Sequence, residues 1–182
     1  YKTEVDSITA PEYKLNWDVV RNLISEHGLR NSTLSAQMPS ESSSVVCNAT
    51  NGVEPPRDFL SIKKSKKGTL KQIVPSYNTL KNNYTLLWDM TTMGGYLNVM
   101  AVIQKFFDQS ISTNTSYNPQ HYSDSEVPAS VIIGDLLKSY QLGLKTLYYQ
   151  NTYDGKGDEE LVLEPDEKTL TDEIMQLLSE DE

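Results

Sequence analysis

The chain has 182 residues, of which 37% are hydrophobic and 23% charged, a composition typical of a globular domain with one sizeable core. No run of 18 apolar residues occurs, so no membrane-spanning helix is predicted, and a single cysteine argues against a disulfide scaffold and favours a reducing, cytoplasmic location. The formal net charge is −9, but twelve acids and only two lysines lie in residues 154–182, so residues 1–153 are close to neutral and carry no basic footprint for a nucleic acid.

Helical, strand and turn signals alternate through the first half of the chain. From the N-terminus they predict an irregular segment at 1–11, a helix at 17–27, a short strand at 33–38, a hairpin of strands at 59–64 and 69–74, and a helix at 77–90. Asn16 is the candidate N-cap of the first helix, and Gly28 ends it. The hairpin is expected to turn at Gly68.

The second half reads as strand, helix and strand. The predicted elements are a helix at 96–108, a strand at 111–115, a helix at 127–140 opened by Pro128 and ended near Gly143, and a strand at 145–149. This alternation favours a parallel α/β unit. Because so few strands would leave open sheet edges, we expect another polypeptide to complete the sheet.

The acidity separates a tail from the domain. We divide the chain into a domain at 1–153 and an acidic tail at 154–182, in which a short amphipathic helix is predicted at 169–178. Such a tail is typically solvated and mobile, and the alternatives are a docking strip for a basic partner or an acidic adaptor. Since the sequence opens on Tyr1, we expect it to be a piece of a longer protein.

A serine-rich loop is the first chemical candidate. The loop at 39–44 follows a predicted strand, and its serines are placed to cap a helix beginning near Ser42. Free backbone N–H groups and the partial positive charge of a first helical turn, together with hydroxyl donors, suit a phosphate group without any lysine. The structural alternative is an ordinary N-cap with no ligand.

Two adjacent tyrosines, Tyr148 and Tyr149, are the second candidate. A phenol with a pKa of about 10 is neutral near pH 7, so its oxidation releases a proton with the electron. A stacked neighbouring phenol can then take over the radical by giving up its own electron and proton. The alternative is an aromatic pair packed in a sheet. We expect Cys47 to pack as a small hydrophobic residue, His27 and His121 to lie on the surface, and no metal site to form.

Several runs in order resemble one family. They are LRNSTLSA at 29–36, MPSESS at 38–43, NATNGVEPPR at 48–57, QKF at 104–106, DQSIS at 108–112 and KTLYYQNT at 145–152. Together they resemble the C-terminal part of the large, catalytic subunit of class I ribonucleotide reductase, over roughly residues 1–155. The resemblance implies an α/β fold, the C-terminal part of a ten-stranded α/β barrel completed by another chain. It also implies radical-based reduction of ribonucleoside diphosphates to deoxyribonucleotides.

The resemblance assigns roles to seven residues. The family's substrate-phosphate loop is matched by Pro39, Ser40, Glu41, Ser42 and Ser43. The family's radical-transfer tyrosines are matched by Tyr149, which would receive the radical, and Tyr148, which would pass it to a catalytic cysteine. Successive side chains of a regular strand point to opposite faces, so a stacked pair predicts a backbone irregularity or a strand end at these tyrosines.

The family's radical cysteine and its redox cysteine pairs have no counterpart here, and Cys47 matches none of them. We therefore expect the chain to be inactive alone and to bind an N-terminal fragment of the large subunit. A radical-generating small subunit would hold the metallocofactor, with no cofactor in this chain, and a thioredoxin or glutaredoxin type reductant would act through another chain. No nucleic acid or membrane partner is expected. The alternative is a non-catalytic phosphate-binding or interaction module that keeps the fold.

Overall fold

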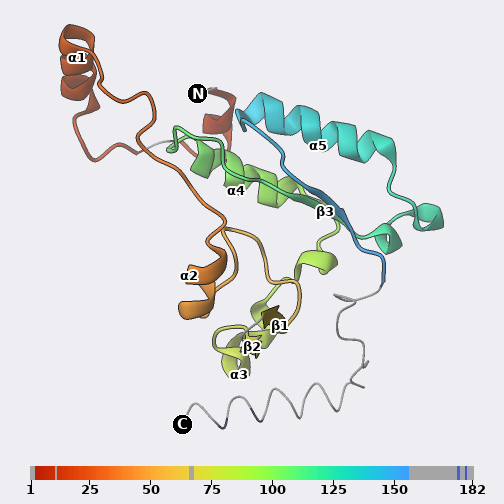
Figure 1. The fold of residues 1–182 in the computed structure, drawn as a ribbon. Helices are drawn as coiled ribbons and strands as arrows, with labels where there is room; N and C mark the ends of the chain where they lie inside the picture. The colour runs from red at the N-terminus through yellow and green to blue at the C-terminus, as the bar shows by residue number, and fades with distance from the viewer. Residues whose placement is uncertain (1–2, 11, 66–67, 156–175, 177–178, 180–182) are drawn as a thin grey trace. The chain divides into compact units, whose positions relative to one another are not determined.

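A computed structural model describes residues 3–10, 12–65, 68–155, 176 and 179 (Figure 1). The chain divides into two compact units. The first comprises Tyr1–Met38, Met93–Thr115 and Pro128–Tyr149, and the second comprises Pro39–Thr92, Ser116–Val127 and Gln150–Glu182. The helix predicted at 169–178 lies outside the described residues, apart from position 176.

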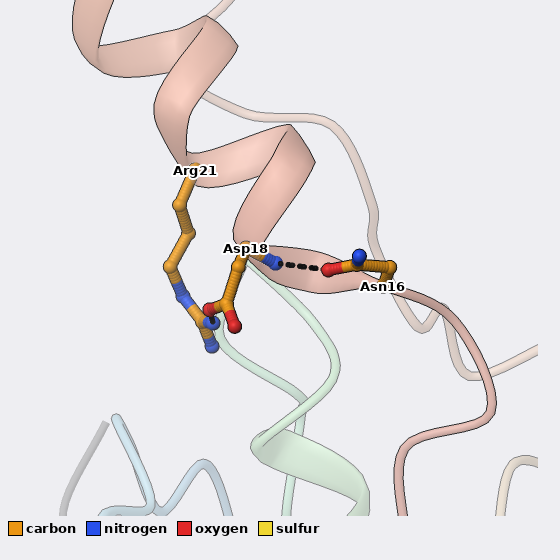
Figure 2. A network of polar contacts seen from close by, with 3 residues as sticks. All are labelled: Asn16, Asp18 and Arg21. Atoms are coloured by element: carbon orange, nitrogen blue, oxygen red, sulfur yellow. Dashed lines mark hydrogen bonds and ion pairs between the residues drawn. The ribbon is translucent and has the colours of Figure 1, made fainter.

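Helix α1 (Trp17–His27) has the bounds that its local signals predict. The side chain of Asn16 accepts a hydrogen bond from the backbone N–H of Asp18 at 3.2 Å, which satisfies one free donor of the first turn (Figure 2). Arg21 forms an ion pair with Asp18 at 2.8 Å, one turn along the same face (Figure 2). Gly28, at φ 77°, ends the helix as predicted.

The core of the first unit lies between two longer helices. Helices α4 (Gly94–Gln104) and α5 (Ala129–Leu142) pack against each other and against the short 3-10 helix η1 (Thr3–Ser7), and Figure 1 shows α4 and α5 side by side. Leu97 is fully buried, and Val5 of η1 is 2% exposed, so the segment predicted to be irregular contributes to the core. Pro128 and Gly143 flank α5, as predicted.

Helix α4 ends at Gln104, four residues before the predicted end, because the Gln104 side chain closes a tight turn. Its amide nitrogen donates to the carbonyl oxygens of Phe107, at 3.0 Å, and Gln109, at 2.8 Å. Its amide oxygen accepts from the backbone N–H of Ile111 at 2.9 Å. Gln104 is 3% exposed, so this side chain fixes the chain's path from the helix toward residues 113–115.

Residues 33–38 do not form the predicted strand. The backbone N–H of Leu34 donates to the carboxylate of Asp108 at 2.8 Å, and the carbonyl of Ser35 accepts from Gln109 N–H at 3.1 Å. The Asp108 carboxylate therefore accepts from the Leu34 N–H, which a neighbouring strand would bond in a sheet.

The hairpin of the second unit is confirmed, but Gly68, the expected turn residue, is the first residue of its second strand. Strands β1 (Leu60–Ser65) and β2 (Gly68–Ile73) pair antiparallel, with Leu60 opposite Ile73 and Ser65 opposite Gly68. Phe59 packs edge-on against the rings of Tyr77 and Tyr84, with centroid distances of 5.5 and 6.4 Å.

The prediction of one helix at 77–90 is wrong. The segment instead contains α3 (Tyr77–Leu80) and two 3-10 turns, η2 (Lys81–Asn83) and η3 (Leu87–Asp89). The Tyr84 hydroxyl donates to the carbonyl of Pro75 at 2.7 Å, and the N–H of Leu87 donates to the carbonyl of Pro56 at 2.8 Å. These tertiary bonds draw the chain out of the helical path that the apolar spacing predicts.

A second sheet joins β3 (Thr115–Tyr117) and β4 (Gln150–Thr152), with α5 between them in the sequence. The predicted strands at 111–115 and 145–149 are therefore each shifted toward the C-terminus. Thr115 N–H donates to Tyr149 O and Tyr153 N–H to Tyr117 O, both at 2.9 Å, so the paired positions advance together along the chain. The expected parallel β-α-β alternation is confirmed. Short 3-10 turns, η4 (Pro119–His121) and η5 (Ser123–Ser125), follow β3.

Among the described residues, no helix is both long enough and apolar enough to cross a membrane. These residues also contain two two-stranded sheets, so the mixed α/β composition agrees with the sequence prediction.

Candidate functional site

The serine-rich loop belongs to the second unit and leads into a short helix, α2 (Glu41–Val46). The first helical hydrogen bond runs from Ser44 N–H to Ser40 O at 2.9 Å, so the helix begins at Glu41, one residue earlier than expected. Ser40 has left-handed backbone angles, φ 59° and ψ 40°, where an N-cap residue is usually extended. Ser42 and Ser43, in the first turn, are exposed to solvent.

A set of contacts behind α2 fixes the loop. The Ser44 hydroxyl, in a residue that is 4% exposed, donates to the side-chain oxygen of Asn51 at 2.7 Å, so it faces the interior of the unit. The Gln72 amide of β2 donates to the Ser44 carbonyl at 3.4 Å. Gly52 has φ +53°, and a Cβ there would lie 3.8 Å from the carbonyl oxygen of Pro39. The Asn51-Gly52 turn therefore lies next to Pro39, at the start of the loop.

Cys47 lies at the C-terminal end of α2 and is exposed, so the expectation that it packs as a small hydrophobic residue is wrong. Its place at the helix end gives it the backbone bond Cys47 N–H to Ser43 O, at 3.0 Å, and leaves the thiol in solvent. His27 and His121 are exposed, as predicted. In the part of the chain that the structure describes, no three His, Cys, Asp or Glu side chains lie close enough together to hold a metal ion.

The two tyrosines belong to the first unit and form a close ring pair. The Tyr148 and Tyr149 ring centroids are 4.3 Å apart with an interplanar angle of 66°, an edge-to-face arrangement. The side chains are 62% and 58% exposed, so the pair lies at the surface of the described structure. A hydrogen bond with Tyr148 raises the pKa of Tyr149 above its ordinary value, and the charge on Tyr148 and slight burial add to the effect. The Tyr149 phenol is therefore neutral at pH 7.

The backbone passes from irregular structure to a β-strand at this pair. Strand β4 begins at Gln150, directly after Tyr149, which confirms the predicted strand end. Tyr148 N–H donates to Thr113 O at 2.8 Å, and Tyr149 O accepts from Thr115 N–H at 2.9 Å. The sequence identified the two tyrosines but not the residues that hold them, because those lie about 35 positions earlier in the chain and give no local signal.

Comparison with known proteins identifies one family. The sequence matches the family described as ribonucleotide reductase, barrel domain, over residues 1–150. It is 55% identical to the ribonucleoside-diphosphate reductase subunit alpha of Buchnera aphidicola subsp. Schizaphis graminum over 158 residues, which are 87% of this chain and 21% of that protein.

More distant relatives give a similar picture. The chain is 52% identical to the ribonucleoside-diphosphate reductase 1 subunit alpha of Escherichia coli K12 over 158 residues (87% of this chain, 21% of that protein). It is 42% identical to the corresponding subunit alpha of Enterobacteria phage T4 over 166 residues (90% and 22%). The chain spans about a fifth of the length of these curated relatives.

Proposed function

The chain belongs to the ribonucleotide reductase barrel-domain family, and from this premise we propose that it forms the C-terminal part of a ribonucleoside-diphosphate reductase large subunit. Its contribution is the substrate-phosphate loop and the tyrosine radical relay of a radical-based reduction of ribonucleoside diphosphates to deoxyribonucleotides. The observation that carries the proposal is the ring pair of Tyr148 and Tyr149, 4.3 Å between centroids, within a chain of this family.

The relay works by transfer of one electron and one proton at each step. Tyr149 would give one electron to an oxidant in the small subunit, where we place the radical-generating metallocofactor, and its neutral phenol would release the proton to the solvent that its exposed side chain contacts. Tyr148 then gives one electron and one proton to the Tyr149 radical, which restores the Tyr149 phenol. The 4.3 Å ring spacing supports this step, because the two phenol rings are in direct contact. A thiol on another polypeptide would in turn reduce the Tyr148 radical.

The loop at Pro39–Ser43 would hold the substrate's diphosphate. In the first turn of α2, the backbone N–H groups have no acceptor within the helix, and Ser42 and Ser43 are exposed, so their hydroxyls can add to the donors. Hydrogen bonds to a charged acceptor are about twice as strong as neutral ones, so a few such donors suit a diphosphate without a lysine. Ser44 is outside this donor set because its hydroxyl is bonded to Asn51.

Another polypeptide is needed to complete the protein, and helix α1 supports this. Its apolar side chains repeat at helical spacing, yet it has no buried residue. Trp17, Val20, Leu23 and Ile24 are 44%, 42%, 51% and 39% exposed. An apolar stripe of this kind on a helix is normally covered by packing. We assign its cover to the preceding part of the large subunit, which would also supply the remaining barrel strands and the reacting cysteines.

Reconstitution tests the proposal. The purified chain is mixed with the polypeptide that carries the preceding part of the subunit, the small subunit and a thioredoxin or glutaredoxin type reductant. Deoxyribonucleotide formation is then measured. We expect turnover from the mixture and none from this chain with the small subunit alone, whereas full activity from the chain alone would contradict the proposal. Binding of a nucleoside diphosphate without turnover in the complete mixture would favour a non-catalytic phosphate-binding module.

A further inference from the structure

The hydrogen bonds around the tyrosine pair slip by one residue. In a regular parallel ladder, one residue donates its N–H to the neighbouring chain and accepts, through its own carbonyl, from the residue two positions further along that chain. Here Tyr148 donates to Thr113 O, but Tyr149, not Tyr148, accepts from Thr115 N–H. Two residues therefore face the single residue Asn114, which is the definition of a β-bulge.

The bulge explains how neighbouring residues share a face. Regular strand geometry would send the rings of Tyr148 and Tyr149 to opposite sides of the sheet. Because of the extra residue, Tyr148 and Tyr149 both hydrogen-bond through their backbones to the 113–115 segment, and their ring centroids lie 4.3 Å apart. The ring pair thus depends on the local backbone conformation at the bulge.

A bulge leaves one backbone N–H without its ladder partner. At this bulge the N–H belongs to Tyr149, and it donates to the side-chain oxygen Oδ1 of Asn114 at 3.0 Å. Asn114 is the residue opposite the bulge, so its short side chain reaches the extra donor directly. An N–H can be satisfied only by an acceptor, which fixes the orientation of the Asn114 amide.

We propose that Asn114 is a positioning residue for radical transfer, which acts by accepting the Tyr149 N–H and so holding the bulge that brings Tyr148 and Tyr149 together. This inference rests on the proposed relay function. In this role Asn114 contacts the backbone N–H of Tyr149. It keeps the relay geometry through the backbone of Tyr149.

Loss of the Asn114 acceptor should change kcat and leave KM unchanged. A displacement of about 1 Å from a productive geometry costs up to about a hundredfold in rate. Asn114→Leu, which keeps the approximate shape and removes the acceptor, is therefore expected to lower kcat between about tenfold and a hundredfold and leave KM for the nucleoside diphosphate unchanged. Asn114→Asp keeps the acceptor oxygen and is expected to restore most of kcat. Asn78→Leu, the same change at an exposed asparagine of α3, is the matched control.

A second measurement reports on geometry without turnover. Fluorotyrosine is placed at position 149 in the assembled reductase, and its pKa is followed by fluorine NMR as the pH is raised. Because contact with Tyr148 raises the Tyr149 pKa, loss of the bulge in Asn114→Leu is expected to lower it, while Asn114→Asp keeps it at least as high as in the parent protein. Asn114→Ala, which removes the acceptor without adding bulk, is measured beside Leu so that a packing defect in one variant does not remove the test.

The outcomes separate the two proposals. Unchanged kcat and an unchanged Tyr149 pKa in the Leu and Ala variants would overturn the role of Asn114. A lowered kcat that Asp does not restore would also overturn it, since the acceptor would then not be the operative group. Turnover that survives Tyr148→Phe would instead reject the relay itself, whatever Asn114 does to the pKa.

Discussion

Replacing Gln104 with Met should destabilise the protein strongly, although the side chain keeps its length. Gln104 makes three hydrogen bonds of 2.8–3.0 Å and is 3% exposed. Methionine fills the same space but neither donates nor accepts usefully. The change therefore isolates the hydrogen bonds from the packing.

The magnitude depends on which partners can turn to water. Ile111 is 3% exposed, so its N–H would stay buried without an acceptor at a cost of about 1–3 kcal/mol. The carbonyls of Phe107 and Gln109 lie on residues that are half-buried and exposed, so water can replace part of their loss. We assign about 1 kcal/mol to those two bonds together. The expected total is about 2–4 kcal/mol, a large fraction of a typical stability of about 5–15 kcal/mol.

Urea unfolding of the purified protein, followed by circular dichroism, measures this loss. With a slope of about 2 kcal/mol/M, the midpoint should fall by about 1–2 M. Gln109→Met is the matched control, because it makes the same change at an exposed side chain and should shift stability by no more than about 0.5 kcal/mol. Equal midpoints for the two variants would refute the assignment of the turn after α4 to the Gln104 amide.

Three further predictions follow from the site and the core. Ser42→Ala should raise KM for the nucleoside diphosphate by about ten- to a hundredfold with little change in kcat, because a hydrogen bond to a charged group contributes about 1.5–3 kcal/mol. Ser123→Ala is the control in the same steady-state assay. Tyr148→Phe should lower the pKa of Tyr149 toward its ordinary value in a pH titration, since the hydrogen bond that raises it is lost, whereas Tyr140→Phe should not. Leu97→Ala, at a fully buried position of α4, should cost about 2–5 kcal/mol in urea unfolding, while Val99→Ala, at a position 50% exposed, should cost far less.

Local signals predicted those elements whose ends are set by local chemistry. Helix α1 begins after the capping Asn16 and stops at Gly28, and α5 lies between Pro128 and Gly143, so the sequence alone located both. The helix expected at 77–90 failed because bonds from distant residues decide that segment. Pro75 and Pro56 accept from Tyr84 and Leu87, and helical spacing carries no information about such partners.

The candidate site divides in the same way. The tyrosine pair and the serine loop are contiguous in sequence, so their chemistry could be recognised from the chain alone. Their supports could not, because Asn114 lies 35 residues before Tyr149 and Asn51 acts on Ser44 through a turn. The expectation of a strand at 145–149 also failed for this reason, since the bulge opposite Asn114 delays regular pairing until Gln150.

The central claim is that Tyr148 carries a radical through its phenol. The most direct measurement is deoxyribonucleotide formation by the reconstituted reductase that contains Tyr148→Phe, beside nucleoside-diphosphate binding and subunit assembly in the same preparation. Phenylalanine keeps the ring but lacks the hydroxyl whose proton and electron leave together. We expect turnover to be abolished while binding and assembly are unchanged. Substantial turnover by the Phe variant would contradict it.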